Sequence, residues 1–225
     1  MSETISKYIE KDPVSFIHVK ELLTRNYSII FESDKGFIIH DDDIGFTYMS
    51  FNDRDTMINE LSKKRYEHYL AYDKEIVDFY NDNDSVKILH QFAYPSTKLF
   101  DIEGYDIRIL STDYAPILDS FYKAIGPEEK NIDALKRKDV LGLFENDKLA
   151  GIIGKHPEGC VGMLHVFEEF RKKGYGEVLE KAMINKLIKE KKMVFCEVVD
   201  GNEISMHLQE KLGYVKGDKK IYWLV

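Results

Sequence analysis

The chain has 225 residues, of which 44% are hydrophobic and 32% charged, and its formal net charge is −8. This length and composition are typical of a globular protein with one large or two small domains. A chain of this size can build a stable core without disulfides or bound metals. The acidic balance argues against nucleic acid or an anionic membrane as a general partner, because like charges repel.

The two cysteines, Cys160 and Cys196, lie in apolar runs that are predicted as strands. We identify no CxxC pair and no Cys/His cluster in the sequence, so we expect no zinc or other metal site and two reduced, buried thiols. No apolar stretch approaches the roughly 18 to 20 residues of a membrane span, and the N-terminus lacks the apolar core of a signal peptide. We therefore expect a cytoplasmic protein.

The N-terminal part is predicted to begin with a helix and to continue with strands that are separated by turns. Asp12-Pro13 is a usual helix start, and residues 33–36 have the composition of a hairpin turn. Asp41-Asp42-Asp43 is predicted as a solvated turn, since a calcium loop would need a further spaced set of oxygen ligands. The expected elements are a helix over 14–23 and strands over 27–31, 37–40 and 45–51.

Residues 52–80 are predicted as one helix, because their apolar residues recur at a spacing of three to four. Residues 52–55 resemble a helix cap at its start. A strand over 86–94, ended by Pro95, completes this part.

The C-terminal part alternates strands and helices in a clear order. The expected strands are 105–110, 140–145, 149–154, 161–167 and 193–199, and the expected helices are 112–125, 128–138, 174–192 and 203–212. Gly126-Pro127 is expected to end the first of these helices, and Gly213 the last, in the left-handed conformation. Residues 214–217 and 220–225 are predicted to close the chain as a hairpin.

The most informative stretch is a strand that leads through a Gly-rich turn directly into a helix, over residues 164–176. Free backbone N–H groups at a helix N-terminus bind anions, and Gly174 and Gly176 allow a diphosphate to approach closely. Residues 171–192 carry eight Lys or Arg and three Glu, a local charge of +5. The spacing lacks the third glycine of a Rossmann site and the Gly-Lys-Ser/Thr of a P-loop. The alternative is an ordinary turn before a helix with a lysine-rich outer face.

These residues resemble the signature of the GNAT superfamily of acyl-CoA N-acyltransferases. Its Arg/Gln-x-x-Gly-x-Gly/Ala motif is matched by Arg171, Gly174 and Gly176, and its upstream Leu-x-Val by Leu164 and Val166.

A second motif of the superfamily is a strand, an Asn, a helix and Leu-Gly-Phe. It is matched by the strand at Cys196, by Asn202 and by Leu212-Gly213-Tyr214. The resemblance covers about 120 residues.

The resemblance implies an α/β fold with a GNAT-like mixed central sheet flanked by helices, preceded by a smaller α/β domain. We expect the catalytic, acyl-CoA-binding domain over 105–225 and an N-terminal domain of unknown role over 1–104. The whole chain is also loosely similar to the glycine-acyltransferase-like branch.

The resemblance further implies that acetyl-CoA or another acyl-CoA is the co-substrate, without a metal, and that the acceptor is the amine of a small molecule or amino acid. Pantetheine would lie along residues 164–166, and the diphosphate would bind the amides of residues 172–176. Instead of binding the co-substrate, His165 could have a packing or surface role. Asn202 could instead cap a helix. The expected cofactor-binding residues are Leu164, His165, Val166, Arg171, Lys172, Lys173, Gly174, Tyr175, Gly176 and Asn202.

Two catalytic residues follow from the resemblance. Glu197 lies in the middle of a predicted strand, at a position where some members of the family use Glu as a base. The alternative is that its carboxylate has a structural role. Gln209 occupies the position of the tyrosine that protonates the leaving thiolate in many members, and an amide cannot act as an acid. The chain could therefore also be a non-catalytic acyl-CoA-binding module. A third possibility is that residues 1–105 serve homodimer formation or the recognition of a macromolecule.

Overall fold

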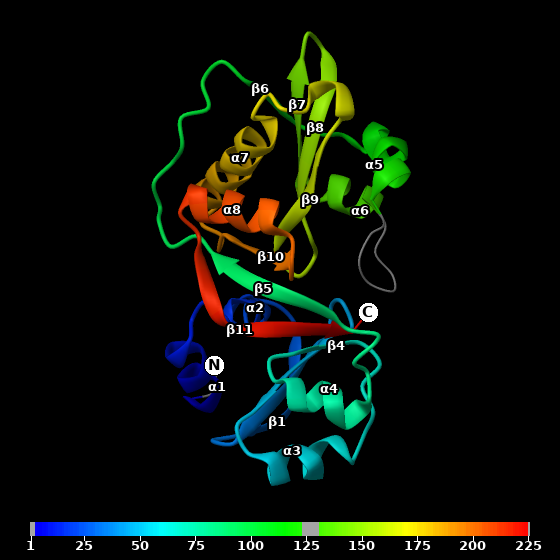
Figure 1. Ribbon diagram of the computed structural model, residues 1–225, viewed down its shortest axis with the longest axis vertical. Coiled ribbons are helices and arrows are strands. Elements are labelled where there is room, and N and C mark those ends of the chain that lie inside the picture. The colour runs from blue at the N-terminus through cyan, green and yellow to red at the C-terminus, as the bar shows by residue number, and fades with distance from the viewer. Residues whose placement is uncertain (1–2, 123–130, 225) are drawn as a thin grey trace. The chain divides into compact units, whose positions relative to one another are not determined.

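A computed structural model of the protein describes residues 3–122 and 131–224 (Figure 1). It divides into two compact units: unit 1 comprises Met1–Ala93, Glu197–Glu210 and Tyr214–Val225, and unit 2 comprises Tyr94–Cys196 and Lys211–Gly213. None of the described helices combines the length and apolarity needed to cross a bilayer.

Unit 1 contains a mixed sheet with the strand order β1-β2-β3-β4-β11-β5. The pair β3/β4 is parallel and the other pairs are antiparallel. The elements are α1 (Glu3–Lys11), α2 (Ile17–Leu22), β1 (Tyr27–Ser33), β2 (Gly36–Asp41), β3 (Thr47–Phe51), α3 (Arg54–Leu61), β4 (Tyr69–Ala71), α4 (Lys74–Tyr80), β5 (Lys87–Ala93) and β11 (Val215–Leu224).

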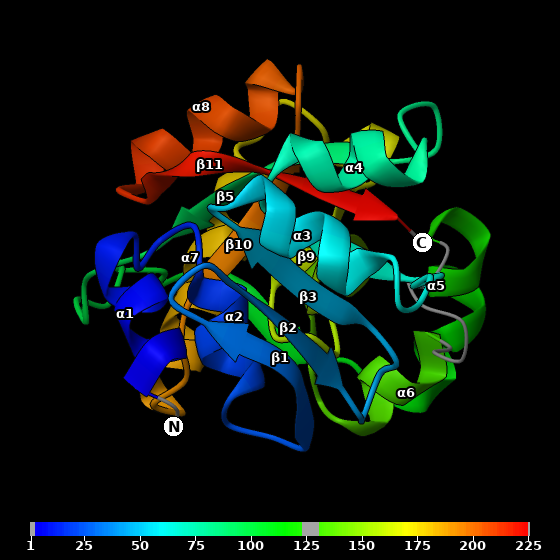
Figure 2. The ribbon, with the colours of Figure 1, turned by 90° about the horizontal axis from the view of Figure 1, so that it is seen from below.

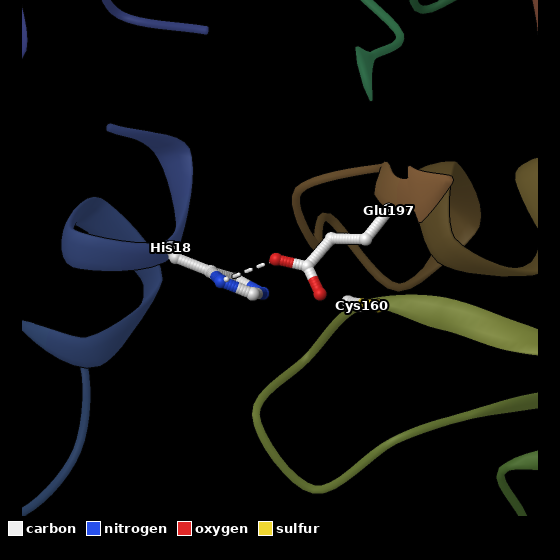
Figure 3. A group of neighbouring side chains, drawn as sticks. All are labelled: His18, Cys160 and Glu197. Carbon is white, nitrogen blue, oxygen red and sulfur yellow. Dashed lines mark ion pairs between the residues drawn. The ribbon is translucent and has the colours of Figure 1, made fainter. Parts of the chain in front are cut away.

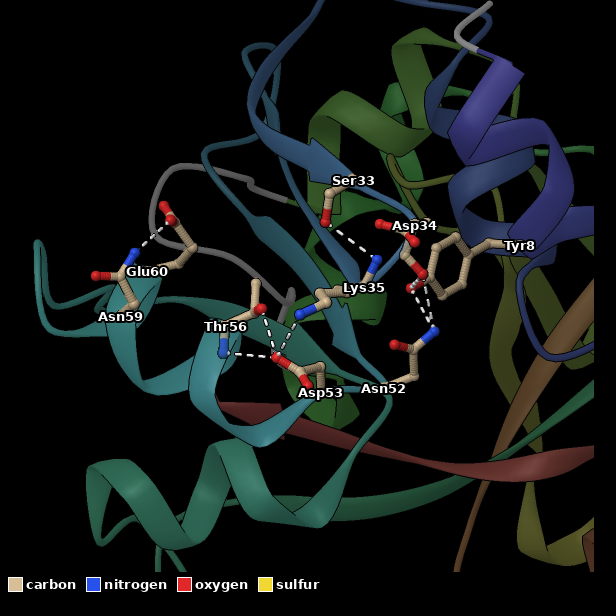
Figure 4. Close-up of polar contacts among 9 residues, drawn as sticks. All are labelled: Tyr8, Ser33, Asp34, Lys35, Asn52, Asp53, Thr56, Asn59 and Glu60. Atoms are coloured by element: carbon tan, nitrogen blue, oxygen red, sulfur yellow. Dashed lines mark hydrogen bonds and ion pairs between the residues drawn. The ribbon is translucent and has the colours of Figure 1, made fainter.

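Local side-chain hydrogen bonds fix the start of α3, as the sequence predicted. The Asp53 carboxylate accepts hydrogen bonds from the Thr56 amide at 2.9 Å and from its hydroxyl at 2.5 Å (Figure 4). Asn52 donates to the hydroxyl of Tyr8 and to the carbonyl of Asp34, which ties the cap to α1 and to the β1–β2 turn. The predicted β1–β2 hairpin and its turn are confirmed.

One hydrophobic core cluster of unit 1 lies between the sheet and the helices α3 and α4, which lie next to each other in Figure 2. Its buried residues are Ile38, Met49, Phe51, Met57, Leu61, Tyr66, Tyr69, Ala71, Ile76 and Val77.

The predicted single helix over 52–80 is wrong, because the strand β4 interrupts it and leaves α3 and α4 as separate helices. Tyr69–Ala71 pairs in parallel with β3 and antiparallel with β11. These partners are distant in sequence, so no local periodicity could reveal the strand.

The predicted C-terminal hairpin is also wrong, because β11 is one strand with a register irregularity between Lys216 and Lys220. It lies between β4 and β5. For this reason the compact units do not coincide with the expected ranges 1–104 and 105–225: the end of the chain completes the sheet of unit 1.

Unit 2 contains the strand order β10-β9-β8-β7-β6, with β9 and β10 parallel and the other pairs antiparallel. Two elements, β10 (Phe195–Val199) and α8 (Glu203–Leu212), contribute residues to both units. The other elements are β6 (Asp106–Ile109), η1 (Thr112–Tyr114), α5 (Ala115–Phe121), α6 (Asn131–Lys136), β7 (Val140–Glu145), β8 (Lys148–Lys155), β9 (Val161–Val166), η2 (Glu168–Phe170) and α7 (Tyr175–Lys189).

The strands and helices predicted for this part are confirmed within a few residues at their ends. The ends of the two helices expected around Gly126-Pro127 fall on residues 123–130, outside the described residues. Helix α7 packs on β7, β8 and β9. Gly213 ends α8 with φ of 89°, as expected. The α/β fold with a mixed sheet flanked by helices is therefore confirmed.

Candidate functional site

The turn between β9 and α7, in unit 2, is the segment for which the sequence predicts an anion site. Lys172 and Gly174 adopt left-handed backbone conformations, with φ of 63° and 78°. None of the described residues accepts a hydrogen bond from the amides of residues 172–176. Consecutive free amides at the positive end of a 15-residue helix form an anion-binding concavity.

The two glycines of the turn leave room for a ligand. A Cβ atom added to Gly174 would meet nothing within 4 Å. One added to Gly176 would lie 3.9 Å from the side chains of Leu164 and Val166. The N-terminus of α7 therefore faces the part of β9 along which pantetheine is expected.

The basic side chains of the turn are partly engaged within unit 2. Lys173 forms an ion pair with Glu145 at 2.7 Å, and the Tyr175 hydroxyl donates a hydrogen bond to the same carboxylate. These contacts lower the pKa of Glu145 below its ordinary value and raise that of Tyr175. Arg171 donates from Nε to the carbonyl of Val166 at 3.1 Å.

Four of the eight basic residues of 171–192 form ion pairs. Besides Lys173, Lys181 pairs with Glu177, and Lys186 and Lys192 pair with Glu190. Glu177 and Glu190 are already counted in the local charge of +5, so these pairs leave most of that excess in place.

A β-bulge interrupts β9 at Met163 and Leu164, where the stretch expected to bind pantetheine begins. Ile152 pairs with His165 and Gly154 pairs with Gly162, so Met163 and Leu164 together oppose Ile153. Met163 has φ of 56°. A bulge leaves one residue outside the ladder and re-aims the backbone, which suits a strand that must offer an amide to a ligand.

His165 packs between aromatic rings, in agreement with the packing alternative. Its ring stacks on Phe121 at 4.3 Å and meets Phe167 edge-on at 5.1 Å. Burial lowers its pKa, and the charge of Arg171 adds to this effect. Both effects favour the neutral form of the imidazole.

Glu197, the predicted base, lies in unit 1 in contact with a residue that the sequence did not single out. His18 of α2 places Nδ1 3.1 Å from a carboxylate oxygen of Glu197, and the two side chains are only 1% and 4% exposed (Figure 3). Burial, followed by the charges of Glu197 and Asp12, raises the pKa of Tyr72 well above its ordinary value. Nothing in the pattern around residue 18 marks this histidine, since its partner lies 179 positions along the chain.

The remaining predicted residues also lie in unit 1. Asn202 caps α8, since its side-chain oxygen accepts a hydrogen bond from the Ser205 amide at 3.2 Å. Gln209 is buried, and its carbonyl accepts a hydrogen bond from the Tyr214 amide. The structure thus gathers residues 164–166 and 171–176 in unit 2 and places Glu197, Asn202 and Gln209 in unit 1.

Comparison with known proteins agrees with this fold. Residues 140–224 match the family model described as FR47-like protein. A search of curated proteins finds no match. Neither the family match nor the structures below support the closer resemblance to the glycine-acyltransferase-like branch.

Several solved structures are similar over nearly the whole chain. A Drosophila protein is 17% identical and covers 99% of this chain and 95% of its own, with a TM-score of 0.70. A GNAT-family acetyltransferase from Colwellia psychrerythraea is 14% identical (93% and 88% covered, TM-score 0.54). A GCN5-related N-acetyltransferase-like protein from Streptococcus suis is 12% identical (94% and 97% covered, TM-score 0.54). At these identities the comparison establishes a GNAT-like fold.

Proposed function

We propose that the protein is an acyl-CoA-dependent N-acyltransferase that uses acetyl-CoA and acylates the amine of a small molecule or amino acid. The observation that carries the proposal is the row of free amides at residues 172–176, at the end of a bulged strand and the start of α7. The FR47-like match over residues 140–224 and the GNAT-like fold support it.

The diphosphate of the co-substrate is proposed to bind the amides of Lys172 to Gly176. Each N–H···O⁻ bond is charge-assisted, and the helix dipole adds about 0.3–1 kcal/mol. Beside this turn, a cavity of about 440 Å³ is lined by residues that include Tyr105, Glu145 and Tyr175. The two tyrosine rings lie 6.4 Å apart and offer aromatic surface to a purine base.

The proposed reaction is a direct transfer without a covalent enzyme intermediate. The neutral amine attacks the thioester carbonyl, a tetrahedral oxyanion forms, and the C–S bond breaks to release the CoA thiolate. A backbone N–H of the bulged part of β9, near Leu164, is proposed to stabilise the oxyanion. Holding both reactants together supplies a large part of the rate gain.

Glu197 is proposed as the base that takes the proton from the acceptor ammonium. Its burial and its contact with His18 support this role, because the imidazole holds the carboxylate in one orientation. Gln209 can hydrogen-bond the leaving thiolate but cannot protonate it. The nitrogen loses a proton after the C–N bond forms, and a water molecule is proposed to pass this proton to the thiolate.

The proposal is tested by mixing the full-length protein with acetyl-CoA and a panel of small amines and amino acids. Release of CoA thiol is followed with a chromogenic disulfide, and CoA binding is measured separately by calorimetry. We expect CoA binding together with amine-dependent thiol release. Binding without release from any amine would instead favour the non-catalytic acyl-CoA-binding module. Absence of CoA binding would overturn both functions.

A further inference from the structure

The turn between β8 and β9, in unit 2, brings three potential metal ligands together. His156, Glu158 and Cys160 occupy alternate positions of a five-residue segment, and a nitrogen, a carboxylate oxygen and the sulfur lie within 4.8 Å of one another. The three residues are 5%, 4% and 4% exposed.

The backbone of this turn is held in shape by its own hydrogen bonds. The His156 amide donates to the carbonyl of Cys160 at 2.9 Å, and the Gly159 amide donates to the carbonyl of His156 at 3.0 Å. Gly159 has φ of 102°, a conformation that other residues rarely adopt. The ends of the segment therefore stay close together, so the three side chains leave the backbone at fixed points.

The imidazole of His156 is also fixed in place. A Cβ atom added to Gly162 would lie 2.3 Å from Nε2, so the ring lies against the bare backbone of β9. The Tyr122 hydroxyl lies 3.2 Å from Nε2 and 3.3 Å from Nδ1. Contacts of this kind around a ligating histidine set its orientation and increase metal affinity.

We propose that His156, Glu158 and Cys160 bind one divalent transition-metal ion, of which Zn²⁺ fits the donor set best. Thiolate, imidazole and carboxylate are the three ligand types that zinc takes in proteins, at about 2.0–2.3 Å and in tetrahedral geometry. Bond lengths of this size separate neighbouring ligand atoms by about 3.3–3.8 Å. Since the present atoms lie within 4.8 Å of one another, each pair needs to close by at most about 1.5 Å. A fourth ligand comes from solvent.

Binding exchanges the thiol proton for the metal. Cys160 donates its S–H to the carbonyl of Val161 at 3.5 Å. In the proposed step this proton leaves to solvent, a sulfur–metal bond forms, and no electron is transferred. The affinity for the metal ion therefore rises with pH. It stops rising once the thiol and the imidazole of the metal-free protein are both deprotonated.

The test uses the full-length protein, stripped of metal by a chelator and titrated anaerobically with Co²⁺ and then Zn²⁺. We expect one equivalent of Co²⁺ to produce thiolate-to-cobalt charge-transfer absorption, and one equivalent of Zn²⁺ to abolish it. Cys160→Ser is expected to lose this absorption and to weaken Zn²⁺ binding about tenfold or more. The matched control is Cys196→Ser, which removes a second buried thiol from the same unit and is expected to retain both properties.

Two outcomes would overturn the metal site: no stoichiometric Co²⁺ binding by the wild type, or a thiolate band that depends on Cys196 and not on Cys160. If Cys160→Ser fails to fold by circular dichroism, His156→Gln is measured instead, and it is expected to weaken Zn²⁺ binding while a weaker thiolate band persists. These measurements contain no CoA and no amine, so their outcome is independent of the proposed acyltransferase activity.

Discussion

At the scale of single residues, the pair Glu197–His18 is the most consequential feature. A carboxylate that is 4% exposed in the middle of a strand requires a partner, and His18 meets it at 3.1 Å. The pair also gives the N-terminal part of the chain a role in the proposed chemistry, because His18 belongs to α2.

Glu197→Gln is expected to lower kcat by about 10²- to 10⁴-fold, the usual contribution of a general base, and to leave CoA affinity within a factor of about two. The amide keeps the size of the side chain but cannot take a proton. Steady-state rates and calorimetry check this, with Glu210→Gln, exposed on α8, as the control. An unchanged rate across the pH range would remove Glu197 from the mechanism.

His165 is expected to titrate below its ordinary value of about 6.5, because burial and Arg171 both disfavour its charged form. The pKa of His165 is lower in the folded than in the unfolded protein, so protonation favours unfolding. The contribution of the neutral imidazole to the free energy of unfolding is complete above the unfolded-state pKa. It is lost as the pH falls from there through the folded-state pKa. An NMR titration should give the low pKa. His165→Phe, which keeps the stacking on Phe121, should reduce the loss of Tm on acidification, and an equal loss in both proteins would contradict the assignment.

At the scale of elements, the decisive feature is the junction of β9, the turn and α7. The left-handed conformations at Lys172 and Gly174 expose consecutive amides, and Gly176 keeps the helix end close to β9. The charged side chains modulate this site, since Lys173 is held by Glu145 of β7.

Gly174→Ala should weaken CoA binding about tenfold, or about 1.4 kcal/mol, because the new methyl group projects into the space proposed for the diphosphate. Gly45→Ala is the matched control. Both glycines have positive φ, of 78° and 77°, and open space around the position of a Cβ. Each variant should lose about 1–2 kcal/mol of stability to backbone strain, whereas only the first should lose affinity. Equal affinities in calorimetry would place the ligand elsewhere.

Glu145→Gln should strengthen CoA binding about two- to fivefold, because it releases Lys173 from a surface ion pair. Glu190→Gln, which releases Lys186 and Lys192 at the other end of α7, should leave the affinity unchanged. Weaker binding by the first variant in the same calorimetric assay would show that Glu145 supports the ligand.

At the scale of the whole molecule, the end of the chain completes the sheet of unit 1. Strand β11 lies between β4 and β5 and carries Trp223, the only tryptophan, whose ring lies 5.8 Å from that of Phe46. Residues 197–225 therefore depend on the first 93 residues for a large part of their pairing and burial.

A fragment of residues 105–225 is expected not to fold by itself, because β11 loses both neighbouring strands. Its Trp223 emission should be shifted to the red and should return towards the native position when residues 1–104 are added. Fluorescence and thermal melts check this. A cooperative melt and native emission from the fragment alone would show that it is an independent domain.

The sequence by itself determined the features that short-range interactions control. The β1–β2 and β7–β8 hairpins, the cap of α3 and the Gly-rich start of α7 depend on residues within a few positions of one another, so composition and spacing were sufficient to predict them. The free amides and the two glycines of the turn before α7 also belong to this class, because the local backbone creates them.

Only the tertiary structure decided which distant segments meet. The three-residue strand β4 is too short to show a periodicity of its own, and it exists because β3 and β11 supply its hydrogen bonds. The same holds for the single strand β11 and for the contact of His18 with Glu197. The His156, Glu158 and Cys160 cluster lies close in sequence but depends on the closed backbone of its turn, which their spacing alone does not specify. Buried backbone groups must form hydrogen bonds, so pairing with distant strands can override the local preference of a segment. A single sequence does not show where this happens.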